Sequence, residues 1–164
     1  MLFRKLLFVL FFLAGCGWTP VYYSKSENAG LETEKIDVLP IPEETGRLLR
    51  TQLENLLNPS KTEFEKEYTL QVVLTENINA DQGILGDNTA TRATMQLNAH
   101  IVLKQKEKVL LETDTFAISS YNILMLPYPS VTAEEATRRR LLDALASQIA
   151  TRVTVYFKKH QDNQ

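Results

Sequence analysis

The chain has 164 residues, with 18 lysines and arginines against 20 aspartates and glutamates, a formal net charge of −2. This length suits one domain around one hydrophobic core and argues against a second domain. A mildly acidic chain lacks the basic face that a general nucleic-acid binder needs, so we expect no nucleic acid among its partners.

The first residues have the pattern of an export signal. The basic pair Arg4-Lys5 precedes an apolar run over residues 6–14. This run is too short to cross a bilayer, which takes about 20 residues. It closes on Leu13-Ala14-Gly15-Cys16, which resembles the lipobox of bacterial lipoproteins, so we expect cleavage between Gly15 and Cys16. The alternative is an ordinary signal peptide followed by a chance cysteine.

Cys16 is the only cysteine of the chain. It cannot form an intramolecular disulfide, and we expect it to carry a covalent lipid and the protein to need no other cofactor. One acyl chain holds a protein only weakly, whereas the three chains of the lipoprotein pattern make attachment effectively permanent. The next residue is Gly17 and not the aspartate that retains enterobacterial lipoproteins in the inner membrane. The resemblance therefore implies the outer membrane of a Gram-negative cell.

Composition divides the chain into four parts. Residues 1–15 form the signal, and without Arg4 and Lys5 the remainder has 16 basic against 20 acidic residues, a net charge of −4. Polar residues up to Lys35 predict a lipidated tether over residues 16–35. We expect a single α+β domain over residues 36–158 and a polar tail over residues 159–164.

The domain begins with a strand and a helix. Residues 36–41 favour a short strand at a sheet edge or strand end, because Pro40 cannot donate a hydrogen bond to a ladder. Residues 44–57 have a helical period, which Asn58-Pro59 ends. Three leucines form its apolar stripe and two lie beside it: Leu49, Leu53 and Leu56, with Leu48 and Leu57.

Three strands should follow. Residues 68–75 and 93–104 alternate between apolar and polar side chains, which predicts half-buried strands. In the second of these, Met95, Leu97, Ala99, Ile101 and Leu103 should face inward, and Thr94, Gln96, Asn98, His100 and Lys104 outward. A charged turn leads to a hairpin partner over residues 109–121, whose apolar phase shifts between Leu111 and Phe116 and suggests a bulge there.

The final helix has the clearest start signal. Thr132-Ala133-Glu134-Glu135 matches a capping box, and a helical stripe follows it: Leu142, Leu145, Ile149, Val153 and Tyr156. The order β-α-β-β-β-α predicts a two-layer α+β sandwich. Both helices should pack on a mostly antiparallel four-stranded sheet.

No catalytic set is apparent. The chain has two histidines, His100 on a predicted strand face and His160 in the tail, and no cysteine apart from Cys16. No metal-ligand spacing and no phosphate-binding loop is present. We therefore expect a protein that is not an enzyme and holds no metal.

The layout resembles the LPS-assembly lipoproteins, the LptE family, in its alphaproteobacterial form. The resemblance covers nearly the whole mature chain and depends on the lipobox, the element order and four short motifs. These are the opening Cys16-Gly17-Trp18-Thr19-Pro20-Val21-Tyr22, the helix start Gly46-Arg47-Leu48-Leu49-Arg50-Thr51-Gln52-Leu53, the strand entry Thr89-Ala90-Thr91-Arg92, and Ser120-Tyr121-Asn122 with Pro127-Tyr128.

This resemblance implies a non-enzymatic subunit that plugs an outer-membrane, LptD-like β-barrel, helps it assemble and binds lipopolysaccharide in transit. The lipid anchor fits this role, because tethering raises the effective concentration of the domain at the barrel. Two alternatives remain open: a lipoprotein auxiliary to an ABC-type lipid transporter, and a cell-wall-associated enzyme.

Two kinds of surface could carry binding. An apolar run interrupted by prolines suggests a partner contact, or else a loop folded over the core edge; its candidates are Ile123, Leu124, Met125, Leu126 and Tyr128. The outward face of residues 94–104 could instead line the wet barrel interior or remain solvated. Phosphates of lipopolysaccharide need basic residues, for which the candidates are Arg92, Lys104, Lys106 and Lys108, although a charged turn is often only solvated.

Overall fold

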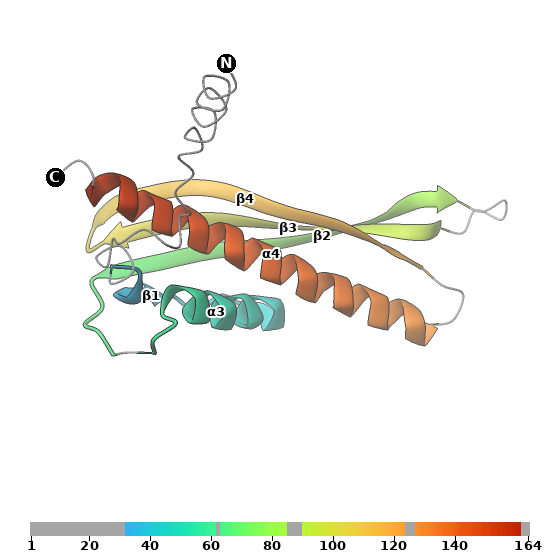
Figure 1. The fold of residues 1–164 in the computed structure, drawn as a ribbon. Helices are drawn as coiled ribbons and strands as arrows, with labels where there is room; N and C mark the ends of the chain where they lie inside the picture. Colours follow the sequence, from blue (N-terminus) through green and yellow to red (C-terminus); the bar gives the residue numbers. More distant parts are fainter. Residues whose placement is uncertain (1–31, 62, 85–89, 124–126, 162–164) are drawn as a thin grey trace, which may run out of the picture.

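The structure is a computed structural model that describes residues 32–61, 63–84, 90–123 and 127–161. Six elements follow one another in the expected order (Figure 1). They are β1 (Ile36–Val38), α3 (Glu43–Leu57), β2 (Tyr68–Ile84), β3 (Ala90–Gln105), β4 (Lys108–Asn122) and α4 (Pro127–Gln161). Within these ranges no helix is both long enough and apolar enough to cross a membrane.

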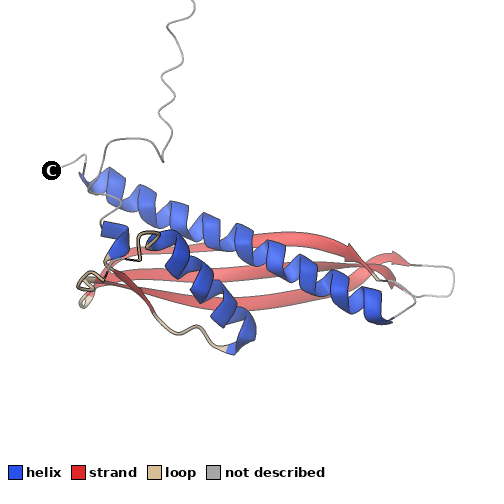
Figure 2. Cartoon of the chain, turned by 60° about the horizontal axis from the view of Figure 1, so that its bottom comes forward, coloured by secondary structure: helices blue, strands red, loops and turns tan. Residues whose placement is uncertain are grey.

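The four strands form one sheet in the order β1-β2-β3-β4. β1 pairs with β2 in parallel, as expected for strands joined by a crossover helix, and the other two pairs are antiparallel. Both helices cover the same face of this sheet (Figure 2). The predicted two-layer α+β sandwich is confirmed, and so is the edge position of the strand before Pro40.

Apolar and polar side chains alternate along β3, and the apolar ones face the helices. Met95, Leu97 and Ile101 are fully buried beneath the helices, whereas the intervening residues point to the opposite face, as predicted. Leu70 and Val72 of β2 extend the buried row. The core is therefore a single layer of side chains between the sheet and the two helices.

Helix α4 matches the sheet in length. Its 35 residues extend for roughly 52 Å at about 1.5 Å per residue, and strands of 15 to 17 residues extend for roughly 50 Å at about 3.3 Å per residue. Leu142, Leu145, Ile149 and Val153 of the predicted stripe have no exposed surface. Tyr156, the last member of the predicted stripe, is partly buried and packs against this core, and its neighbour Phe157 is buried as well.

The start of α4 was predicted wrongly. The helix begins at Pro127, so the capping-box residues 132–135 lie inside its second turn. Proline is compatible with a first helical turn because the backbone N–H groups there have no intrahelical acceptor. Pro127 and Pro129 therefore lie where a helix tolerates them, and they do not force a loop.

In α3 the buried stripe consists of Leu49, Leu53 and Leu57, spaced four residues apart. Leu56, which was placed on the stripe, is 48% exposed, and Leu48 is 45% exposed. The prediction was therefore right for Leu49 and Leu53 but placed Leu56 on the stripe in place of Leu57. The helix packs on the sheet along its i, i+4 row and leaves the adjacent leucines at the surface.

The strands are irregular at places other than the predicted one. The β3–β4 pairing is continuous from Leu111 to Asn122, so no bulge separates Leu111 from Phe116; the extra residue is Leu110, opposite the Leu103/Lys104 step. A second irregularity lies between Asn79 and Gln82 of β2, which continues nine residues beyond the predicted end at Thr75. The apolar phase shift in β4 instead reflects apolar side chains on the outer face.

Both ends of the predicted domain need extension. Residues 32–34 form a helical turn, and Thr33 is buried, although the sequence placed them in the tether. At the other end α4 includes residues 159–161 of the expected tail. Within the described residues the folded unit thus extends from Glu32 to Gln161.

At Gly46, α3 touches the segment after β1 without space for a side chain. A Cβ built on it would lie 2.6 Å from Ile41 Cγ2 and 2.9 Å from the Ile41 carbonyl oxygen. The backbone oxygen cannot move away as a side-chain tip could. The glycine in the Gly46-Arg47-Leu48 motif is therefore explained by close packing.

We predict that Gly46→Ala lowers the free energy of unfolding by about 1 to 2 kcal/mol, although alanine is the better helix former, because overpacking costs more than the propensity gained. Urea denaturation of the mature protein measures this. Thr51→Ala on the exposed side of the same helix is the control and should be neutral or slightly stabilising. A Gly46→Ala protein as stable as the wild type would mean that Ile41 can move aside.

Candidate partner and lipid interface

The end of the domain where the tether enters is held by a charged network. Lys35 Nζ lies 2.9 Å from Glu67 and 3.2 Å from Glu32, and the Tyr68 hydroxyl donates to Glu32 at 2.7 Å. The Glu67 and Glu32 carboxylates raise the pKa of Lys35. Burial, and then the hydrogen bond to Glu32, raise the pKa of Tyr68 to about 12. Glu32, the first described residue, is thus fixed to β2 and to Lys35. Cys16 and Gly15 lie outside the described residues.

Aromatic rings continue this end of the domain toward the end of α4. The Tyr68 and Phe157 rings meet edge to face at 4.9 Å, and Phe157 meets Tyr156 at 5.6 Å. Tyr156 in turn lies 4.1 Å from the His160 ring. Such pairs contribute about 0.5–1.5 kcal/mol each beyond their buried area. The tether entry, β2 and the last turns of α4 are therefore joined in one cluster.

We predict that stability decreases between about pH 10 and 12 and that Tyr68→Phe weakens this decrease. The phenol has a higher pKa in the folded protein than in the unfolded chain, where it is about 10. Its contribution is complete below the unfolded pKa and is lost as pH rises through the folded one. Thermal unfolding followed by circular dichroism at each pH measures the difference. Identical wild-type and Tyr68→Phe profiles would contradict it.

The structure separates the four basic candidates into two places. Lys106 lies in the two-residue turn of the β3–β4 hairpin, where its backbone has a φ of 54°, with Lys104 and Lys108 on either side. Arg92 is exposed at the opposite end of β3, roughly 45 Å away at about 3.3 Å per strand residue. A single phosphate-bearing headgroup cannot touch both places.

Arg92 lies beside the predicted apolar run. It pairs with Asn122, the last residue of β4, so the half-buried Ile123 follows directly after its strand partner. Tyr128 belongs to the first turn of α4, and Leu124, Met125 and Leu126 lie outside the described residues. Arg92 and Ile123, one candidate from each group, therefore lie at the same end of the domain, away from Glu32.

The outer face of the sheet is covered by none of the described residues. Its cross-strand rows include Thr75–Asn98–Phe116 and Asn77–Gln96–Ile118. Phe116 is 59% exposed and Ile118 is 55% exposed, with Val73 at 52% nearby. The polar residues expected on this face are there, but the apolar ones of β4 were missed. The sequence did hold an indication of them. Phe116 and Ile118 are an odd number of residues from Leu111, so in a regular strand they point to the opposite face.

His100 lies in the same outer face between two carboxylates. Its Nδ1 lies 2.8 Å from Asp114 and its Nε2 lies 3.5 Å from Glu112, both on β4. All three residues are substantially exposed. Across the described ranges, no three His, Cys, Asp or Glu side chains lie close enough to hold a metal ion.

An ion-pair network under the inner face joins the first half of α4 to the sheet. The Arg138 guanidinium donates to Glu76 of β2 at 2.8 and 3.0 Å and to Glu134 at 2.7 Å. The Tyr121 hydroxyl of β4 donates to Glu134 at 3.3 Å. The Glu76 carboxylate, and then Glu134, raise the pKa of Arg138, and burial raises that of Tyr121. The alternating pattern of this strand ends at Thr75, so the sequence did not indicate a role for Glu76.

We predict that Arg138→Ala lowers the free energy of unfolding by about 1–3 kcal/mol, because it leaves two partly buried carboxylates without their cation. Arg139→Ala is the matched control. That arginine is 75% exposed and lies 3.7 Å from Glu135, so its loss should change stability by about 0.5 kcal/mol or less. Equal effects of the two substitutions in urea denaturation would show that the network is not structural.

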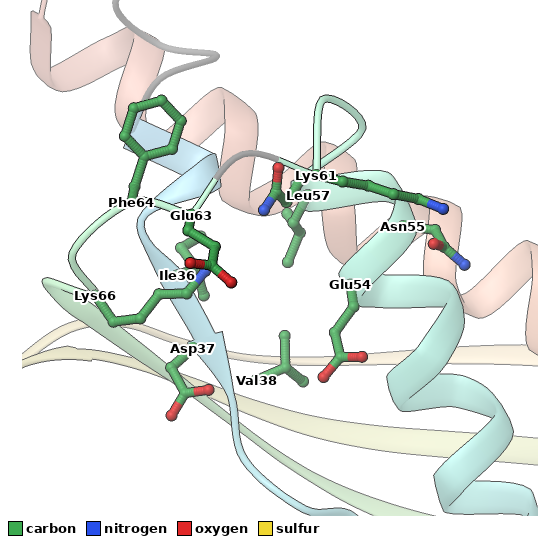
Figure 3. Close-up of a pocket in the computed structure, with 11 residues that line it drawn as sticks. Ile36, Asp37, Val38, Glu54, Asn55, Leu57, Lys61, Glu63, Phe64 and Lys66 are labelled. Atoms are coloured by element: carbon green, nitrogen blue, oxygen red, sulfur yellow. The ribbon is translucent and has the colours of Figure 1, made fainter.

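A groove with a volume of about 570 Å³ opens between β1, the end of α3 and the loop that follows it (Figure 3). Ile36, Val38 and Leu57 lie deep in it, and the carboxylates of Asp37, Glu54 and Glu63 lie around it, with two lysines. Its charges are mixed and it includes neither histidine nor cysteine. Nothing in it selects one class of ligand.

Comparison with known proteins finds the same fold in solved structures of bacterial lipoproteins. Neither a family model nor a curated protein sequence matches the chain. Three solved structures share the fold. A lipoprotein of Caulobacter crescentus has a TM-score of 0.62 at 18% identity, over 79% of this chain and 96% of that one. A minor lipoprotein of Acinetobacter baumannii has a TM-score of 0.58 at 21% identity, over 74% and 92%. Lipoprotein B of Nitrosomonas europaea has a TM-score of 0.52 at 12% identity, over 80% and 92%.

Proposed function

We propose that this chain is an outer-membrane lipoprotein of the LPS-assembly type, anchored through Cys16. It binds and plugs the barrel that exports lipopolysaccharide, assists its assembly and acts by binding, not by catalysis. Three observations support the proposal: the lipobox, a fold shared with bacterial lipoproteins, and a long sheet face left open. The open sheet face is the main support, because it exposes the large apolar side chains of Phe116 and Ile118 that a partner would cover.

The composition of this face suits the inside of a barrel. Rows of asparagine, glutamine and threonine can remain hydrated or bond to polar lumen residues, and Phe116 and Ile118 add an apolar contact between them. Interfaces commonly combine apolar anchors with a polar, wet surround. A rigid strand surface presents these groups without an ordering cost.

The lipopolysaccharide contact is best placed at Arg92. A lipopolysaccharide binder has to offer a cation for phosphate beside an apolar surface for acyl chains. Arg92 is exposed and its strand partner Asn122 precedes the half-buried Ile123. This end also lies farthest from the tether, which suits a lipid that is passed onward from the anchored side.

The decisive test is affinity purification of the tagged, full-length lipoprotein from its native membranes. We predict that an outer-membrane β-barrel co-purifies in stoichiometric amount and that Phe116→Glu with Ile118→Glu reduces its yield at least tenfold, because two carboxylates replace the apolar contact. Val155→Glu is the control, since Val155 is also exposed (45%) but lies on α4, and it should leave the yield unchanged.

Depletion of the protein should also lower surface lipopolysaccharide and folded barrel together. Unchanged levels of both would remove the proposal. Co-purification with an inner-membrane transporter instead of a barrel would favour the auxiliary role in an ABC-type system.

A further inference from the structure

Strand β2 has a free edge over most of its length. Within the described part of the chain, β1 pairs with it from Tyr68 to Leu70, and the last backbone bond joins the Leu39 N–H to the Leu70 carbonyl at 2.9 Å. β2 continues to Ile84, and beyond Leu70 its strand neighbour is β3 alone. Figure 1 shows β2 extending well past β1 and α3.

The sequence ends β1 early. Pro40 and Pro42 follow it, and proline has no backbone N–H to donate to a neighbouring strand. The chain therefore leaves the sheet and enters α3, which begins at Glu43. The edge of β2 beyond Leu70 is left without a partner strand among the described residues.

This edge presents a row of backbone donors and acceptors. Successive residues of a strand direct their N–H and C=O groups to opposite neighbours. The Leu70 carbonyl points toward β1, so Val72, Leu74, Glu76 and Ile78, here named the edge residues, point their backbone groups to the same side. None of the described residues bonds to these groups. The residues between them pair with β3 instead.

The free edge also lacks the features that usually protect edge strands, which are lysine, proline or a bulge. Residues 72–79 contain neither lysine nor proline, and the irregularity of β2 comes only after Asn79. Their one charged residue, Glu76, is turned inward to the ion-pair network of α4. In contrast, the first half of β4, at the other edge of the sheet, carries Glu112, Asp114 and an extra residue opposite β3.

A groove with a volume of about 420 Å³ lies beside this edge. One wall is β2, with Val73 and Leu74, and the other is the segment that leaves β1, with Pro40, Ile41 and Pro42. Val73 is 52% exposed. An added strand would lie about 4.8 Å from β2, and the groove offers it apolar contacts on both sides.

We propose that the free edge of β2 binds an extended segment of the barrel partner, which joins the sheet as a further strand beside the edge residues. This rests on the proposed function, which supplies the barrel as partner. A row of backbone donors and acceptors selects another polypeptide, because acyl chains have no groups to pair with it. The free edge is also continuous with the open sheet face: Val73 belongs to the outer row Val73–His100–Asp114. One partner can therefore cover both.

The added strand fixes the position of the domain in the barrel. Side-chain contacts on a flat face tolerate sliding, whereas backbone pairing sets the register in steps of two residues. The fitting segment has apolar or β-branched side chains at alternate positions, because its neighbours across the pair are Leu74 on the inner side and Val73 on the outer side.

Hydrogen exchange of the full acylated protein, free in detergent and in its purified barrel complex, tests the pairing. In the free protein the edge-residue amides should exchange fast and those of Val73 and Thr75 slowly, because only the latter bond within the sheet. In the complex the edge-residue amides should slow at least about tenfold. Nuclear magnetic resonance reads each amide separately, and a contact through side chains alone does not produce this alternation.

Ile78→Pro and Ile78→Ala form a matched pair of variants. The Ile78 N–H points to the free edge, so proline removes a bond to the added strand and none to β3, whereas alanine keeps the N–H. Ile78→Pro should lower the yield of co-purified barrel about tenfold and Ile78→Ala less than about twofold. Circular dichroism checks the fold. If the proline variant does not fold, the exchange pattern of the wild-type complex decides.

The outcomes separate this contact from the proposed function. If the barrel co-purifies but the edge-residue amides stay unprotected, or both variants retain it equally, the strand addition is wrong and the proposed function stands. Protection already present in the free protein would mean that residues 17–31 or a second copy occupy the edge, and would overturn the proposal; sedimentation analysis distinguishes the two. If the partner is an inner-membrane transporter, the proposed function fails; alternating protection in that complex would uphold strand addition, and its absence would overturn it.

Discussion

The packing of α4 along one face of the sheet is the constraint on which the rest of the structure depends. Its apolar stripe from Leu142 to Val153 meets the alternate residues of β3, from Met95 to Leu103, and both rows are buried. Helix and strands have matching lengths of roughly 50 Å. Because a strand buries only every second residue, the same packing that dries the inner face leaves the outer face open.

The second layer is not uniform along its length. Near the tether α3 and α4 together cover the sheet, and the contacts there are apolar and aromatic, including the Tyr68–Phe157 pair. Toward the start of α4 the inner face carries Glu76 and Tyr121 instead, and Arg138 joins them to the helix. With less apolar area to bury, that half of α4 is held by charged hydrogen bonds, which depend on geometry more than on area.

The two ends of the elongated domain therefore differ in chemistry. One has the tether, the aromatic cluster and all the described lysines, and the other has Arg92 beside Ile123 and the beginning of α4. The proposed function, between a membrane and a partner, would use such a difference. The solved structures of similar fold show that this architecture occurs in bacterial lipoproteins. The proposed roles of the two ends come from the side chains that this chain carries.

Local patterns in the sequence determined the element order, the fold class, the inward residues of β3 and most of the α4 stripe. Apolar residues recur about every 3.6 residues in a helix and every second residue in a strand, so neighbouring residues alone distinguish the two. They also gave the lipobox. The ends of helices and strands were predicted less well. The sequence predicted a loop at Pro127 and Pro129, whereas the structure places both prolines in the first turn of α4. Only the tertiary structure decided that Phe116 and Ile118 lie outside, that Glu76 pairs with Arg138, and that Arg92 and Lys106 are far apart. Each of these facts depends on register or on a contact between distant segments, which residue type and spacing along one segment do not specify.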